Sequence, residues 1–280
     1  MLDDEDFLAP PRGTVAERLS DRLWITVPVR GNGKLAAILE AANADEELYG
    51  LLLAANVNAM ERLGMTDHGP VHVKIVMNVA LKLIRILADR GVTPSVITNY
   101  GFEYHDAEVV VALASMLHDV GMSIHRIEHE TFSLFIAQDK LRDLLAPAYS
   151  VAEAAVLRSE ILHAIIAHRS GGRPLTVEAG VVRIADALDM AKGRSRIPFQ
   201  AGSVSIHSVS AAAVEAVRIE PGDAKPVKLV IDLSNSAGVF QVDQLLREKL
   251  RGSGLEDHLE VEVAMAEGDS ERRLVQSFRL

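Results

Sequence analysis

Apolar positions recur roughly every three to four residues over the first two thirds of the chain, which is the period of helices that bury one face. The clearest apolar stripe runs from Val73 to Leu87, and Gly91 and Pro94 then end the helix. Asp67-His-Gly-Pro before it is a helix-start signal, with a proline placed just inside the first turn. The same period predicts further helices at 35–42, 46–63, 106–118, 132–145, 151–168 and 177–190.

The pattern changes after residue 210. Apolar and polar residues alternate at 217–219, 227–233, 259–265 and 274–280, which is the period of strands with one buried face, and a helical period at 239–250 lies among them. A shorter strand-like run covers Leu23–Val29. Arg30–Lys34 lacks the spacing of a phosphate-binding loop and predicts a plain turn into a helix.

These patterns predict a mainly α fold with two parts. We expect a helical domain with an N-terminal extension over residues 1–200, and a small α+β domain over 201–280, joined through a connector at 201–210. A free strand edge in the smaller domain favours pairing with a second copy of the chain, so we expect a homodimer. Ligand binding is the other role expected of this domain.

Composition narrows the class of protein. The 280 residues are 49% apolar, but no run reaches the roughly 18 apolar residues of a membrane helix. The first residues, Met1–Phe7, are acidic and predict no signal peptide. Cysteine is absent, which excludes disulfides, thiolate zinc sites and a cysteine nucleophile. We therefore expect a cytoplasmic protein without a membrane partner.

The net charge of −10 argues against an extended nucleic-acid surface, whereas a small phosphorylated substrate needs only a local basic patch. Histidine is the informative residue type, because eight of the ten histidines lie between His68 and His168. His118 and Asp119 stand side by side after the apolar run Val109–Ala114, and Gly121 is expected to end that helix. A buried pair of this kind needs a partner, and a metal ion fits it.

Three segments together resemble the HD-domain superfamily of metal-dependent phosphohydrolases. The segments are His72-Val-Lys-Ile-Val, Leu117-His-Asp-Val-Gly and Arg183-Ile-Ala-Asp-Ala-Leu-Asp, and the resemblance covers about residues 68–196. It implies that four residues hold a first metal: His72, His118, Asp119 and Asp186. Superfamily members with two metals add histidines between the His-Asp pair and the last aspartate, and Asp119 would then bridge both ions.

For the second ion, His129 and His168 are the candidate ligands, with His125 and His163 as alternatives. His68 is expected to belong to the capping turn, and we do not expect His105, His207 or His258 to be ligands. The cofactor implied is one or two divalent ions of iron, manganese or zinc, because histidine and aspartate accept several metals.

The resemblance implies hydrolysis of a phosphomonoester or phosphodiester, in particular of a nucleotide, by metal-activated hydroxide. Asp119 would then be a catalytic residue. Lys192 and Arg194, directly after the last aspartate, are expected to bind the phosphate, and Arg169 and Arg173 flank the turn after His168.

Two departures from the superfamily pattern bear on the substrate. Many members have lysine after the glycine of the His-Asp motif, where this chain has Met122, and the Gly-Tyr-Pro signature of cyclic-dinucleotide phosphodiesterases is missing after His168. We therefore do not assign cyclic di-GMP. Two alternatives use the same scaffold: a di-iron oxygenase, and a non-catalytic, metal-stabilised sensor or assembly module.

Overall fold

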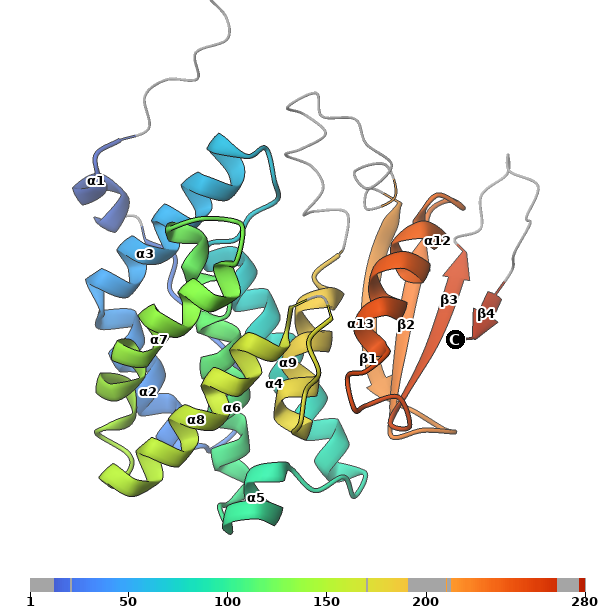
Figure 1. Ribbon diagram of the computed structural model, residues 1–280. Helices are drawn as coiled ribbons and strands as arrows, with labels where there is room; N and C mark the ends of the chain where they lie inside the picture. Colours follow the sequence, from blue (N-terminus) through green and yellow to red (C-terminus); the bar gives the residue numbers. More distant parts are fainter. Residues whose placement is uncertain are drawn as a thin grey trace, which may run out of the picture.

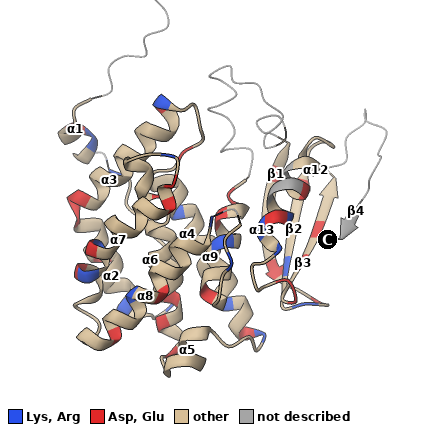
Figure 2. Cartoon of the chain, viewed as in Figure 1, with Lys and Arg blue, Asp and Glu red and all other residues tan. Residues whose placement is uncertain are grey.

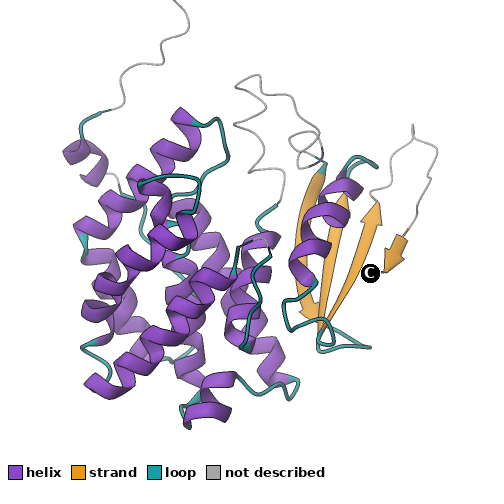
Figure 3. Ribbon diagram, viewed as in Figure 1, coloured by secondary structure: helices purple, strands orange, loops and turns teal. Residues whose placement is uncertain are grey.

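The structure is a computed structural model that describes residues 13–20, 22–169, 171–190, 210, 213–265 and 277–279. A bundle of helices forms one part, and a small sheet with a helix against it forms the other (Figure 1, Figure 2 and Figure 3). The predicted mainly α fold with a small α+β part is confirmed. Within the described ranges, no helix is both long enough and apolar enough to span a membrane.

The bundle contains the helices that the apolar period predicts over the first two thirds of the chain. Its elements are α1 Val15–Ser20, α2 Gly33–Ala44, α3 Glu46–Asn56 with the π-helical turn η1 Val57–Arg62, α4 Pro70–Asp89, α5 Ser95–Tyr100, α6 Tyr104–Leu117, the 3₁₀ turn η2 Val120–Ser123, α7 His129–Leu145, α8 Val151–Ala167 and α9 Val177–Leu188. Pro70 is at the first position of α4, as predicted. The turn before α2 supplies Asn32, whose side chain caps that helix by accepting from the amide of Leu35.

Helix α6 forms the centre of the bundle. Every residue from Asp106 to Leu117 is buried, and α4, α8 and α9 pack around the helix. Its two buried carboxylates are paired, because Arg85 Nε donates to Glu108 at 2.6 Å and Lys34 Nζ donates to Asp106 at 2.7 Å. A helix buried on all sides is held rigidly, so its C-terminal end is a fixed point for the site described below.

The second part is a four-stranded sheet with the order β1-β2-β3-β4. Its strands are β1 Val214–Pro221, β2 Val227–Leu233, β3 Leu259–Met265 and β4 Ser277–Arg279. Strands β1/β2 and β3/β4 are antiparallel, whereas β2 and β3 are parallel, with Leu229 opposite Val261. A parallel pair needs a crossover connection. The connection is one continuous helical segment: α12 Gly238–Phe240, η3 Gln241–Leu246 and α13 Arg247–Leu250.

This crossover helix links the sheet to the bundle. Both η3 and α13 contact α9, and β1 and β2 contact α4 (Figure 1). Buried apolar residues of the bundle and of the sheet belong to one continuous cluster. The division into domains at residue 200, with its connector at 201–210, stays a prediction, because residues 191–209 lie outside the described ranges.

One local prediction is wrong. Leu23–Val29 forms no strand. The side-chain amide of Asn43 instead takes the place of a neighbouring strand, accepting from the amide of Ile25 and donating to its carbonyl, both at 2.9 Å. The apolar period also does not predict α5, which forms between Pro94 and Gly101, whose left-handed conformation ends the helix.

Candidate metal centre

The ends of five helices converge on one point and carry the predicted ligands. His72 lies in the first turn of α4, His118 caps the C-terminus of α6, His129 begins α7, His168 caps the C-terminus of α8, and Asp186 lies in the last turn of α9. All of these side chains are buried except Asp186, which is partly buried. Helix ends are suited to this arrangement, because the chain turns there and can direct side chains inward.

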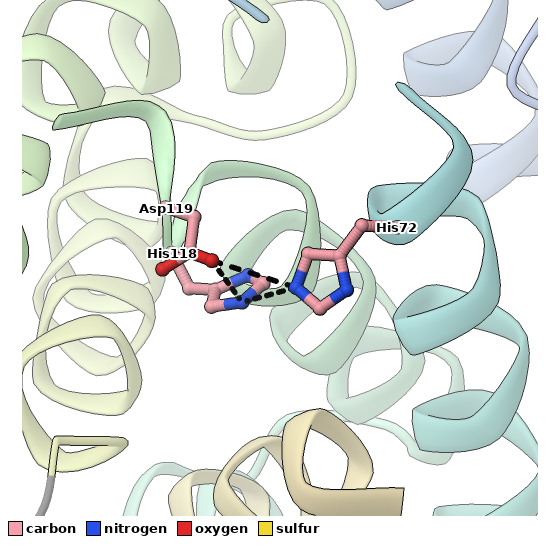
Figure 4. A group of neighbouring side chains, drawn as sticks. All are labelled: His72, His118 and Asp119. Carbon is pink, nitrogen blue, oxygen red and sulfur yellow. Dashed lines mark hydrogen bonds and ion pairs between the residues drawn. The ribbon is translucent and has the colours of Figure 1, made fainter. Parts of the chain in front are cut away.

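His118 and Asp119 both point into the site because α6 ends between them (Figure 4). His118 still has helical dihedral angles, whereas Asp119 has φ −107° and ψ 5°. Gly121 does not provide the left-handed cap that the sequence predicts; it lies inside η2. It is required for a different reason: a Cβ at this position would collide with the backbone of α7 at His129 and Ser133.

The first group of donor atoms comes from His72, His118, Asp119 and Asp186. His72 Nε2 lies 3.2 Å from His118 Nε2, and these atoms lie 3.4 and 3.3 Å from Asp119 Oδ2. Asp186 Oδ1 is 3.7 Å from each of the two nitrogens. Donor atoms around a tetrahedral ion with bonds of about 2.1 Å lie roughly 3.4 Å apart. The spacing of these atoms therefore fits a divalent metal ion.

The second group uses the other carboxylate oxygen of Asp119. Asp119 Oδ1 lies 3.1 Å from His129 Nε2 and 3.6 Å from His168 Nε2. The three residues form a compact, buried donor set, and His168 also belongs to a set with His118 and Asp186. Asp119 thus directs one oxygen toward each group, which is the arrangement of a carboxylate that bridges two ions.

The outer nitrogen of each histidine is held so that its inner nitrogen can bind a metal. His72 Nδ1 donates to Asp189 at 2.6 Å, His118 Nδ1 to the Ser115 carbonyl at 2.9 Å, and His168 Nδ1 to the Ile165 carbonyl at 2.5 Å. His129 Nδ1 lies 3.0 Å from the Arg126 carbonyl, which can accept, and 2.8 Å from Arg126 Nη1, which can only donate. With the hydrogen on Nδ1, the Nε2 lone pairs of His72, His118 and His168 face the cluster, as metal-binding histidines require.

The charges of the cluster call for a cation. Asp119 is 5% exposed, and its ion-pair partners among the described residues are all histidines. Burial acts to raise the pKa of Asp119, but its contacts with the imidazoles of His118, His129 and His168 hold it well below its usual range. Burial alone would lower the pKa of His118, but the carboxylates of Asp119 and Asp186 raise it to about 10. The cluster therefore favours a positive charge, which a metal ion would supply.

The donor groups open into a cavity of about 360 Å³. Its cationic lining residues are Arg126, Arg169 and Lys249, and His68 lies at its wall with Nε2 3.9 Å from Asp119. Arg169, which the sequence places at the turn after His168, lines this cavity, whereas the predicted phosphate-binding residues Lys192 and Arg194 lie outside the described residues. Met122 is fully buried in a small apolar cluster and does not line the cavity.

The alternative ligands lie elsewhere. His125 is exposed and accepts from the amide of Ile127 at 3.0 Å. His163 Nε2 accepts from the amide of Leu175 at 2.9 Å, which braces the loop before α9. Neither residue lines the cavity. His129 and His168 are therefore the histidines that accompany the first donor group.

Sequence analysis missed two residues of the site. Asp189 orients His72 and stands three positions after Asp186, so its place in the Asp-Ala-Leu-Asp segment was a usable signal. Lys249 comes from α13 and donates to the His168 carbonyl at 2.6 Å and to Asp186 Oδ2 at 3.2 Å. No motif marks this lysine, because it reaches the site only through the packing of the crossover helix.

Comparisons with known proteins identify the family of this chain. The family model described as "HD domain" matches residues 71–191, which include every candidate ligand. An uncharacterized protein of Methanocaldococcus jannaschii, MJ1020, is 42% identical over 217 residues, which cover 78% of this chain and 84% of that protein. No solved structure matches. On this match and this relative, the chain belongs to the HD-domain superfamily of metal-dependent phosphohydrolases.

Proposed function

We propose that this protein hydrolyses a phosphomonoester or phosphodiester of a small molecule, in particular a nucleotide, at a site for two divalent ions. The observation that carries the proposal is the position of Asp119, whose two oxygens face two different groups of histidine nitrogens. Membership of the superfamily supports the reaction class. The cavity of about 360 Å³ is in the range of small-molecule sites and supports a substrate of modest size.

One set of residues would bind the metal ions, and a second set would bind the substrate. His72, His118, Asp119 and Asp186 would hold the first ion, and His129 and His168 would complete the second position with Asp119. When bound, such ions lower the pKa of a coordinated water toward neutrality and polarise a phosphoryl oxygen. Arg126, Arg169 and Lys249 then surround the entering phosphate with fixed positive charge.

Metal analysis combined with a substrate screen tests this function. The purified protein is expected to contain about two equivalents of metal, and to release phosphate or a nucleoside monophosphate from a panel of phosphomonoesters and phosphodiesters, equally with and without oxygen. Tightly bound iron with oxygen-dependent turnover and no phosphatase activity would establish the di-iron oxygenase instead. A protein that binds no metal after soaking with iron, manganese and zinc would contradict both enzymatic functions and leave the assembly module.

Metal binding is expected to release protons, because a metal and a proton compete for His118 Nε2. With a pKa of about 10 for metal-free His118, this imidazole is protonated at pH 7 to 8 and must lose its proton to bind a metal. About one proton per protein should leave His118, and the apparent affinity should rise about tenfold per pH unit up to pH 10. Calorimetry of metal binding in buffers of different ionisation enthalpy measures this number. A pH-independent affinity would show that another ligand set binds the metal.

Lys249→Met is expected to lower kcat/KM by about ten- to a hundredfold, because a charge-assisted contact to a phosphate is lost. The six proposed metal ligands remain, so the metal content should stay at two equivalents. Lys249→Arg keeps the charge and should recover part of the activity. Lys82→Met, on the exposed side of α4, is the matched control and should leave both quantities unchanged. An unchanged kcat/KM in Lys249→Met would exclude this lysine from substrate binding.

A further inference from the structure

A second cavity, of about 590 Å³, adjoins α13 and contains none of the candidate metal ligands. Glu248 lines both cavities, while α13 directs Lys249 to the metal site and Arg247 to this second cavity. The other wall is the turn between α8 and α9, which supplies Arg173. Arg173, which the sequence places beside the turn after His168, therefore lines a cavity other than the one at the metal centre.

Positive charge dominates this cavity. Its charged lining residues are Arg173, Arg183, Arg247, Arg251, Asp243 and Glu248. Four arginines and two carboxylates give this lining two excess positive charges, whereas the whole chain has a net charge of −10. Arg247 pairs with Asp243 at 2.6 Å. The guanidinium groups of Arg173 and Arg251 have no hydrogen bond or ion pair to another described residue, and Arg251 is tied to Arg247 only through its backbone amide, at 3.0 Å. Two guanidinium groups on opposite walls are thus available to a ligand.

Arg183 places a further charge at the inner end of the cavity. It is 1% exposed, and its guanidinium donates to the carbonyls of Lys249 at 2.8 Å, of Arg169 at 2.5 Å, and of Ala167 and Glu248 at longer distances. Its hydrogen bonds among the described residues go to carbonyls, and the carboxylates of Glu248, Asp186 and Glu256 act on it only by longer-range attraction. Burial lowers the pKa of this guanidinium, because a charge with no carboxylate in direct contact is costly to bury. An anion in the cavity would add negative charge near it.

We infer that this arginine cavity is a binding site for the phosphate group of a small anionic ligand, separate from the metal centre. The planar guanidinium fork matches two phosphate oxygens at once, so Arg173 and Arg251 can hold the anion from two sides. The buried charge of Arg183 lies behind it. Because these contacts need no metal, the site can be tested on metal-free protein, whatever reaction the metal centre performs.

Isothermal titration of metal-free protein with inorganic pyrophosphate, in the presence of a chelator, tests this inference. We expect saturable binding of one equivalent by the wild type. The double variant Arg173→Ala/Arg251→Ala should bind at least about tenfold more weakly, because two charge-assisted contacts are lost. The double variant Arg90→Ala/Arg142→Ala removes the same charge from exposed positions on other helices and should bind as the wild type does.

A third variant separates the two cavities. Metal-free Asp119→Ala should bind pyrophosphate as tightly as the wild type, because Asp119 does not line the arginine cavity. Three results would overturn the inference: no saturable binding by the wild type, equal binding by the Arg173/Arg251 variant, or an equal loss in the Arg90/Arg142 control. Failure to find hydrolysis at the metal centre would leave these binding results unaffected.

Discussion

Replacing Asp119 by alanine is expected to empty both metal positions at once and to reduce turnover about a thousandfold or more. The reason is its double contact: Oδ2 faces His72 and His118, and Oδ1 faces His129 and His168. Metal ions at such sites stabilise the transition state by several kcal/mol, and each 1.36 kcal/mol corresponds to a factor of about ten in rate. Elemental mass spectrometry and phosphatase assays on the same preparation measure both effects.

Two further variants test whether the loss of both ions is specific to Asp119, the carboxylate proposed to bridge them. Asp139→Ala removes an aspartate from the exposed face of α7, where 81% of the side chain is exposed, and should retain two equivalents of metal and full activity. His129→Ala removes a donor of the second group only and should leave about one equivalent. If Asp119→Ala still contained two equivalents, the two ions would be held without this carboxylate and the bridged site would be wrong.

Much of the helical bundle could be predicted because its helices are long and strictly patterned. The stripe on α4 is an example: Val73, Val76, Met77 and Ala80 are all fully buried, as their spacing predicts. Short or irregular elements carry no such signal. Helix α5 has only six residues, less than two turns, so its apolar positions cannot establish a period.

The strand-like run Leu23–Val29 shows the opposite case: the apolar pattern predicts a strand, but the segment forms none. Alternation predicts an extended backbone with one buried face, and Ile25 is indeed buried. A strand also needs a neighbouring backbone, whereas in the described part of the chain the backbone of Ile25 is hydrogen-bonded by the side-chain amide of Asn43. Sequence periodicity reports which side chains are buried, but it does not report what the backbone pairs with.

The candidate ligands could be named from local motifs. Which residues complete the site around them depends on packing between segments that are distant in the sequence. The motif containing His118 and Asp119 is contiguous, whereas the choice between His163 and His168 depends on helix phase. Five residues along an α-helix correspond to a rotation of about 140°, so the two side chains face different directions. Lys249 lies 63 residues after Asp186 and is brought to it by the crossover between two parallel strands. No local pattern encodes that contact.

Gly121→Ala is expected to destabilise the protein by about 3 kcal/mol, because the added Cβ overlaps backbone atoms and no side chain can move aside. The atoms in its way are the His129 carbonyl oxygen and the Ser133 amide nitrogen, in the first two turns of α7. Relief requires α7 to move away from η2, which displaces His129 from Asp119. We therefore expect a lower midpoint in denaturant unfolding together with loss of the second metal equivalent.

Gly50→Ala is the matched control, because Gly50 lies inside α3 and a Cβ there meets no atom within 4 Å. Alanine is the better helix former, so this variant should gain up to about 1 kcal/mol of stability and keep both ions. The pair distinguishes a steric requirement from a general effect of replacing glycine. Unchanged stability and two metal equivalents in Gly121→Ala would mean that η2 can shift without moving α7. The glycine after the His-Asp pair would then have no part in holding His129 against the bridging carboxylate.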